Sequence, residues 1–152
     1  MNVSIEEIKY IDSVEYVKFI EYCDECTIYH SCEFIRFINT AIPKSSFFMI
    51  IVKENNKIVG SIPFFTLSAK FGTVLNSLPY YGSYGGFIGL NKNSNKYRKV
   101  AFEKMADFCK VNKVSSINVI GSPFDEEIEP ASEFIDLKRW DSRIGQVSIL
   151  PD

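Results

Sequence analysis

The chain has 152 residues, enough for one domain with a buried core. Its 17 basic and 19 acidic residues give a formal charge of −2, so no overall positive field favours nucleic acid, and direct nucleic-acid binding is not expected. No run approaches the ~18 consecutive apolar residues of a membrane span, and the N-terminal segment lacks the pattern of a signal peptide. The 4 cysteines are too few for a disulfide framework. We therefore expect a reduced, cytoplasmic protein with no membrane span.

The first 43 residues predict a strand followed by two helices. The strand fits residues 3–11, and Asp12 is the expected N-cap of the first helix, with Glu15 three residues later. A second helix is expected to begin near Ser31 and to end before Pro43, because the residue before a proline avoids helical dihedrals. The apolar stripes expected for the two helices are Val14, Val17, Ile20 and Cys23, then Phe34, Phe37, Ile38 and Ala41.

A β-hairpin follows these helices. Residues 45–53 are apolar on both faces, which suits a central strand covered on both sides. Asn55 and Asn56 can adopt the positive φ values of a tight turn, and residues 57–65 form the returning strand. Pro63 in that strand has no N–H, so we expect a bulge or a locally unpaired position there.

The second half predicts further strands around one long helix. Residues 71–78 and 85–90 are strand candidates, and residues 95–112 form a helix. The buried face of this helix is expected to carry Tyr97, Ala101, Met105 and Phe108. The remaining expected elements are a strand at 115–121, a mixed helix and loop at 125–140, and a last strand at 143–152. The order β-αα-βββ-α-β-β predicts an α/β (α+β) fold with a mixed sheet.

The run CDECTIYHSC has the residue types of a metal site. Cys23, Cys26, His30 and Cys32 combine a Cys-x2-Cys knuckle with a nearby histidine and a third cysteine. No turn residue separates the first two cysteines, however, and their neighbours are apolar, so we expect packed thiols and no metal. His30 is the only histidine, so any imidazole base is this residue. It can equally line a substrate site or donate a structural hydrogen bond at the second helix.

A segment rich in glycine and tyrosine, residues 76–89, lies before the long helix. Phosphate-binding loops place glycines at the start of a helix, whereas here they precede an apolar strand and none lies between Gly89 and Gly121. A coenzyme pyrophosphate cradle is therefore disfavoured. The basic residues at the helix start, expected to be solvated, are Lys92, Lys96, Arg98 and Lys99. Two interpretations of the segment stay open: a ligand-facing backbone flanked by tyrosines, or a bulged strand junction.

Several of these motifs together resemble a known family. Tyr29-His30, Glu33-Phe34, the stretch from Gly60 to Pro63 and the stretch from Ser77 to Gly86 look like the first half of FemAB-like transferases. These belong to the GNAT (N-acyltransferase-like) superfamily, and the resemblance covers roughly residues 14–150. It implies a mostly antiparallel sheet flanked by helices. It also implies that residues 1–152 form a single GNAT-like domain, the first half of a tandem two-domain protein.

The function that this resemblance implies is an aminoacyl- or acyltransferase acting on cell-wall or cell-envelope precursors. The first domain of such proteins contributes acceptor binding, is inactive alone and holds no cofactor, while acyl-CoA or aminoacyl-tRNA serves the full-length protein as co-substrate. The partners implied are a small-molecule or cell-wall precursor acceptor and a second GNAT-like domain. No catalytic residue is assigned. The expected substrate-binding residues are His30, Tyr80, Tyr81, Ser83, Tyr84 and Gly85, with Arg143 as partner of an anionic acceptor.

Two alternatives stand beside this interpretation. One is a stand-alone GNAT N-acyltransferase that uses acyl-CoA, against which the missing glycine loop counts. The other is a non-catalytic binding module that forms a homodimer through an exposed apolar face.

Overall fold

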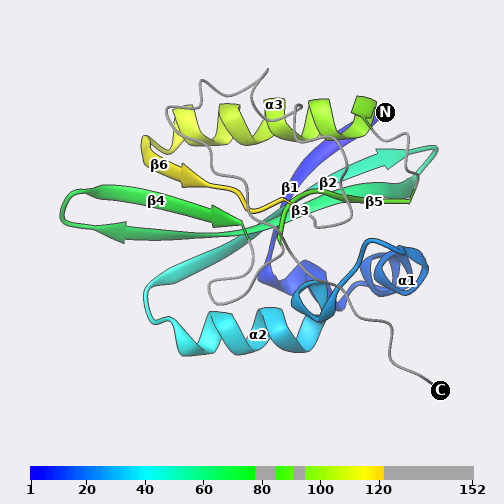
Figure 1. Cartoon of the computed structure of the whole chain (residues 1–152), viewed down its shortest axis with the longest axis horizontal. Coiled ribbons are helices and arrows are strands. Elements are labelled where there is room, and N and C mark those ends of the chain that lie inside the picture. The colour runs from blue at the N-terminus through cyan, green and yellow to red at the C-terminus, as the bar shows by residue number, and fades with distance from the viewer. Residues whose placement is uncertain (78–84, 91–94, 122–152) are drawn as a thin grey trace.

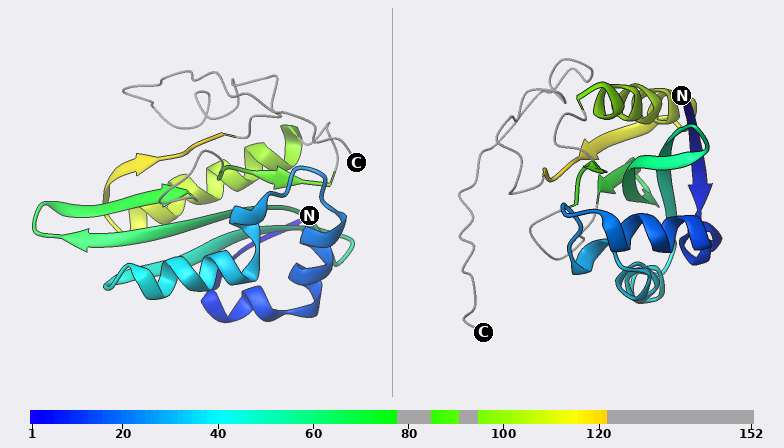
Figure 2. Two further views of the ribbon diagram at one scale, coloured as in Figure 1. Left: turned by 60° about the horizontal axis from the view of Figure 1, so that its bottom comes forward. Right: turned by 90° about the vertical axis from the view of Figure 1, so that its right-hand side faces the viewer.

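A computed structural model of the chain describes residues 1–77, 85–90 and 95–121. Helices α1 and α2 cover one face of a six-stranded sheet, and α3 covers the other (Figure 1). Figure 2 shows the same three layers from two further sides. The elements are β1 (Asn2–Glu7), the 3-10 helix η1 (Ile8–Asp12), α1 (Val14–Tyr22), the 3-10 helix η2 (Ile28–His30), α2 (Cys32–Ala41), β2 (Ser45–Glu54), β3 (Lys57–Ala69), β4 (Gly72–Ser77), β5 (Ile88–Gly89), α3 (Asn95–Val111) and β6 (Val114–Asn118).

The sheet has the order β1-β2-β3-β4-β6, and β5 also pairs with β3. Every described pair of strands is antiparallel except β4 with β6, which run parallel. The predicted mixed, mostly antiparallel sheet flanked by helices is therefore confirmed. The predicted segments at 125–140 and 143–152 lie outside the described residues. Within the described ranges, none of the helices combines the length and the apolar character that crossing a membrane would require.

The β2–β3 hairpin forms as the sequence predicts. Asn55 and Asn56 have φ values of 50° and 59°, the left-handed conformation that a tight hairpin turn needs. The irregularity in this pair lies between Val52 and Lys53, whereas Pro63 pairs regularly with Met49. The bulge, one of the two expectations for Pro63, is therefore not found on the β2 side, where the register at this residue is regular.

On its other edge, β3 changes partner around Pro63. The described pairing with β4 ends at Phe64, and the pairing with β5 involves Ser61 and Gly60. Pro63 has no N–H to donate to a neighbouring strand. The edge of the sheet next to β3 is therefore made by two separate short strands, and Pro63 lies between their described pairings, locally unpaired on this edge within the described ranges, as the sequence predicts.

Two apolar layers lie on the two faces of the sheet. Residues of β2 alternate between them: Met49 and Ile51 pack against α1 and α2, while Ile50 and Val52 pack against α3. Strand β2 is thus covered on both faces, as its unbroken apolar run predicts. The helix residues that complete the layers are Tyr16, Phe19, Ile35 and Ile38 on one side, and Ala101, Phe102, Met105 and Cys109 on the other.

Helix α1 begins one residue later than the sequence predicts. Its N-cap is Ser13, whose Oγ accepts a hydrogen bond from the Tyr16 N–H at 3.2 Å, whereas Asp12 forms an ion pair with Arg36. The buried residues are Tyr16 and Phe19, and Val14 is 68% exposed. The predicted stripe is therefore wrong at its first residue, whereas its later residues do pack against this layer.

The start of α2 is predicted correctly, and its buried face is predicted in part, since Ile38 is buried as expected. Ser31 is the N-cap, and its Oγ accepts from the Phe34 N–H at 3.2 Å. The buried residues are Cys32, Ile35 and Ile38. Phe37 is 61% exposed, and Phe34 packs edge-on against Tyr29 with ring centroids 5.0 Å apart. Two overlapping apolar stripes exist in this sequence, and contact with the sheet selects the aliphatic one.

Substituting Ser31→Ala is expected to lower the free energy of unfolding by about 1 kcal/mol, because the Phe34 N–H loses its acceptor. Chemical denaturation measures the change. Ser31→Asp keeps a side-chain acceptor at the same position and should lie close to the unsubstituted protein. Equal losses in both variants would contradict a capping role for Ser31.

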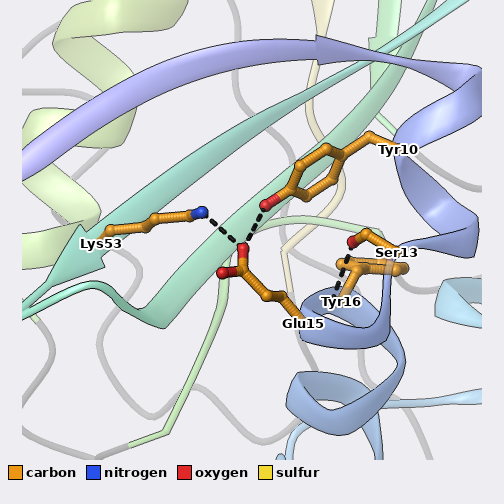
Figure 3. A network of polar contacts seen from close by, with 5 residues as sticks. All are labelled: Tyr10, Ser13, Glu15, Tyr16 and Lys53. Carbon is orange, nitrogen blue, oxygen red and sulfur yellow. Dashed lines mark hydrogen bonds and ion pairs between the residues drawn. The ribbon is translucent and has the colours of Figure 1, made fainter.

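A polar network ties the start of α1 to the sheet (Figure 3). The Tyr10 hydroxyl donates to Glu15 Oε2 at 2.9 Å, and Lys53 Nζ of β2 donates to the same oxygen at 2.5 Å. The ammonium also lies 5.7 Å from the centroid of the Tyr10 ring. These donors, first Lys53 and then Tyr10, hold the pKa of Glu15 below its ordinary value. Because the carboxylate is exposed, the network orients α1 more than it stabilises the fold.

Candidate functional site

The β5 junction, residues 85–90, lies beside the carboxyl ends of the parallel strands β4 and β6. The Gly85 N–H donates to Ile120 O at 3.2 Å, and the Ile120 N–H donates to Ser77 Oγ at 3.0 Å. The Leu90 N–H donates to Val59 O of β3 at 3.2 Å. The carboxyl ends of neighbouring parallel strands are where open α/β sheets bind ligands. The β5 junction is therefore the part of the described chain where we place the candidate site.

A turn between α1 and η2 binds the outer edge of β5. The Cys23 thiol donates to Gly89 O at 3.3 Å, and the Gly89 N–H donates to Glu25 Oε2 at 2.9 Å. Both polar backbone groups of Gly89 are thus satisfied by side chains of residues 23–26, as a neighbouring strand would satisfy them. The turn holds the last residue of β5 in place just before the chain continues to α3.

On the face of the sheet that α3 covers, Phe87, directly before β5, supports a buried cation. The Phe87 ring fills the space over Gly60, where a Cβ would lie 2.4 Å from Phe87 Cζ. The Arg98 guanidinium lies over that ring, 5.6 Å from its centroid, and Arg98 is 6% exposed. The prediction that Arg98 is solvated is therefore wrong, since the ring and the sheet cover it. Lys96 remains exposed and lies 3.4 Å from Glu54 Oε1.

His30 lies buried at the end of η2, with 2% of its surface exposed. Its Nδ1 accepts a hydrogen bond from the Thr27 N–H at 3.2 Å, which places the proton of the neutral ring on Nε2. Nε2 has no hydrogen-bond partner among the described residues. Burial lowers the pKa of His30 to about 4. The ring is therefore neutral at pH 7 and a weak base, and its contacts are those of a structural cap.

The structure describes two of the predicted site residues. His30 bonds to Thr27, whereas Gly85 is buried and bonds to Ile120, and no described hydrogen bond joins His30 to Gly85. Their role in substrate binding stays a prediction. The other predicted site residues lie outside the described ranges: Tyr80, Tyr81, Ser83, Tyr84 and Arg143.

Sequence reasoning missed the roles of Glu25 and Arg98 at the β5 junction. Glu25 meets Gly89 across 64 positions of the chain, and no local pattern signals that contact. The basic run did include Arg98, but its burial depends on Phe87, which the sequence does not place beside it.

The cysteines and His30 do not gather around a metal position. Within the described ranges, no three histidine, cysteine or acidic side chains are arranged to hold a metal ion. The Cys32 thiol donates to Ile11 O at 3.1 Å, and His30 Nδ1 is occupied by Thr27.

Comparison with known proteins yields matches of structure only. No family model matches the sequence, and no curated protein matches it. An aminoglycoside acetyltransferase from an uncultured soil metagenomic sample, in complex with sisomicin, has a TM-score of 0.59 and 11% identity over 99% of this chain and 96% of that one. A ribosomal-protein-alanine N-acetyltransferase from Brucella melitensis biovar Abortus 2308 has a TM-score of 0.55 and 9% identity over 96% and 98%.

A third structure, described as a probable acetyltransferase, has a TM-score of 0.56 and 12% identity over 100% of this chain and 99% of that one. At sequence identities this low, the match shows a shared fold and nothing further. Each structural match covers nearly the whole length of both proteins, and it agrees with the order of strands and helices described above. The chain therefore has the fold of the GNAT acetyltransferases.

Proposed function

We propose that the chain is an N-acyltransferase that moves an acyl group from an acyl-CoA thioester to the primary amine of a small molecule. The observation that supports this most is the likeness to acetyltransferases over nearly the whole length of both partners. One of those relatives is named for aminoglycosides, which are amine-bearing small molecules. This is the stand-alone alternative that the sequence left open beside the FemAB-like interpretation.

The reaction needs orientation more than a covalent intermediate. The amine nitrogen forms a bond to the thioester carbonyl carbon, the carbon–sulfur bond breaks, and the thiol leaves with the proton that the amine gives up. Holding the two reactants in line supplies much of the rate enhancement. The turn at residues 23–26 holds the outer edge of β5, and the Phe87–Arg98 stack lies beside it. These contacts support the proposal that β5 forms one wall of such a site.

The start of α3 offers positive charge for an anionic donor. Lys96 and Lys99 are exposed in its first turns, where the helix dipole also favours anions. Because no glycine lies between Gly89 and Gly121, the run that opens this helix has none, and a donor's phosphates would depend on side-chain charge more than on a backbone cradle. Affinity should then depend strongly on individual lysines and on salt.

Calorimetric titration with acetyl-CoA tests the proposal. We expect micromolar binding, about −8 kcal/mol, that weakens as salt is added. Substituting Lys99→Ala should raise the Kd about tenfold, the effect of one lost charged contact. Lys104→Ala removes the same charge from a later turn of α3 and should leave the Kd unchanged.

No binding of acetyl-CoA at millimolar concentration would contradict the proposal. That result would favour the second candidate, a FemAB-like domain that binds the acceptor while the donor is held elsewhere. The glycine-free run before α3 is the observation in favour of this candidate. The sequence also predicts, for this candidate, the acceptor class, a second GNAT-like domain or a homodimer, and a cytoplasmic location.

A further inference from the structure

Cys23 and Cys26 close a tight turn between α1 and η2. The Cys26 N–H donates to Cys23 O at 3.0 Å, the hydrogen bond of a four-residue turn. Such a turn keeps its first and last Cα atoms within about 7 Å, and a disulfide requires a Cα separation of about 4.4–6.8 Å. The backbone therefore already holds the two cysteines near the separation that a bridge requires.

The two thiols also contact each other. A hydrogen bond from the Cys26 thiol to the Cys23 sulfur lowers the pKa of Cys23 and raises the pKa of Cys26, so negative charge in the pair is favoured on the Cys23 sulfur. Both are free thiols here. Cys23 is 5% exposed, whereas Cys26 is partly exposed, so a small oxidant reaches the pair from the Cys26 side.

The other two cysteines are placed differently. The Cys32 thiol donates to Ile11 O, and burial is the main cause that raises its pKa. Cys109 packs in the apolar layer on the opposite face of the sheet, and burial raises its pKa to about 11. Neither has the combination of turn geometry and thiol contact that Cys23 and Cys26 share.

We propose that Cys23 and Cys26 form a reversible thiol–disulfide pair, a modification site for small-molecule disulfides such as oxidised glutathione. In the exchange the two thiols lose two protons and two electrons and the Sγ–Sγ bond forms. The sulfur–sulfur bond of the small disulfide breaks, and it is reduced to two thiols. This site stands independently of the proposed acyl transfer.

Oxidation at this position acts directly on the β5 junction. A bridged Cys23 sulfur has no proton, so it no longer donates to Gly89 O. Glu25, the acceptor of the Gly89 N–H, lies between the two bridged residues, so the bridge also constrains this second contact. The outer edge of β5 is therefore held by both bonds in the dithiol form and is loosened in the disulfide form.

The experiment equilibrates the protein in glutathione redox buffers and follows thiol number, mass and amide hydrogen exchange. We expect four free thiols to fall to two, the mass to fall by two hydrogen atoms, and peptide mapping to join Cys23 to Cys26. Exchange of the Gly89 amide should become about three- to tenfold faster in the disulfide form.

Two variants distinguish the effect of a Cys23–Cys26 disulfide from a general effect of the oxidant on the protein. Cys26→Ser keeps the Cys23 donor, so its Gly89 exchange should match the reduced protein and should not respond to the oxidant. The double variant Cys32→Ser, Cys109→Ser should still lose two thiols. Retention of four thiols in the unsubstituted protein across the glutathione range, a bridge to Cys32 or Cys109, or an unchanged Gly89 exchange rate would overturn the proposal.

Discussion

Acidification from pH 7 to pH 4 is expected to lower the free energy of unfolding by roughly 3 kcal/mol through His30 alone. Burial lowers the pKa of His30 from 6.5 to about 4 in the folded protein, whereas the unfolded chain keeps the ordinary value. Between these two values the unfolded state binds more protons than the folded state. The stabilisation is therefore complete above pH 6.5 and is lost as the pH falls toward 4.

The physical cause is burial, which disfavours the charged form of the ring. Nδ1 already accepts from the Thr27 N–H at 3.2 Å, and protonating it would break that bond and bury a charge. Urea denaturation at a series of pH values measures the effect. His30→Asn keeps an acceptor near the position of Nδ1 but does not titrate. The difference between the two pH profiles should therefore isolate His30, and parallel profiles from pH 7 to pH 4 would refute this account.

Substituting Phe87→Ala is expected to cost about 3–5 kcal/mol of stability, the usual loss for a buried phenylalanine. The ring is 3% exposed and packs in the layer beneath α3. It also carries the Arg98 guanidinium, so the variant removes a cation–π contact from the start of that helix. Chemical denaturation measures the change in stability.

The reciprocal substitution, Gly60→Ala, tests the same contact from the other side. Its Cβ would lie 2.4 Å from Phe87 Cζ and 3.3 Å from Ile88 O, so the ring must move, at a cost of about 1–3 kcal/mol. Gly121→Ala is the matched control, because a Cβ there meets nothing within 4 Å. In the Phe87→Ala background, Gly60→Ala should be nearly neutral. Additive losses in this double-mutant cycle would mean that the ring does not depend on Gly60.

Local sequence determined the parts of this fold that depend on neighbouring residues. The pair Asn55 and Asn56 predicts a hairpin turn, and Ser31 predicts a helix start, because both effects act within four residues. The unbroken apolar run of β2 likewise predicts a strand covered on both faces. With the helix between β4 and β6 added, these signals suffice for the order of elements and the fold class.

Tertiary structure alone decided which side chains those elements bury and which contacts form the candidate site. Phe37 and Ile35 both belong to apolar stripes of α2, and only the sheet selects Ile35 for the core. Arg98 belongs to a basic run, yet the Phe87 ring covers it. Glu25 meets Gly89 across 64 residues. Local preferences act over a few residues, whereas burial and strand pairing join segments whose separation along the chain carries no local signal, so the β5 junction became visible only in the folded protein.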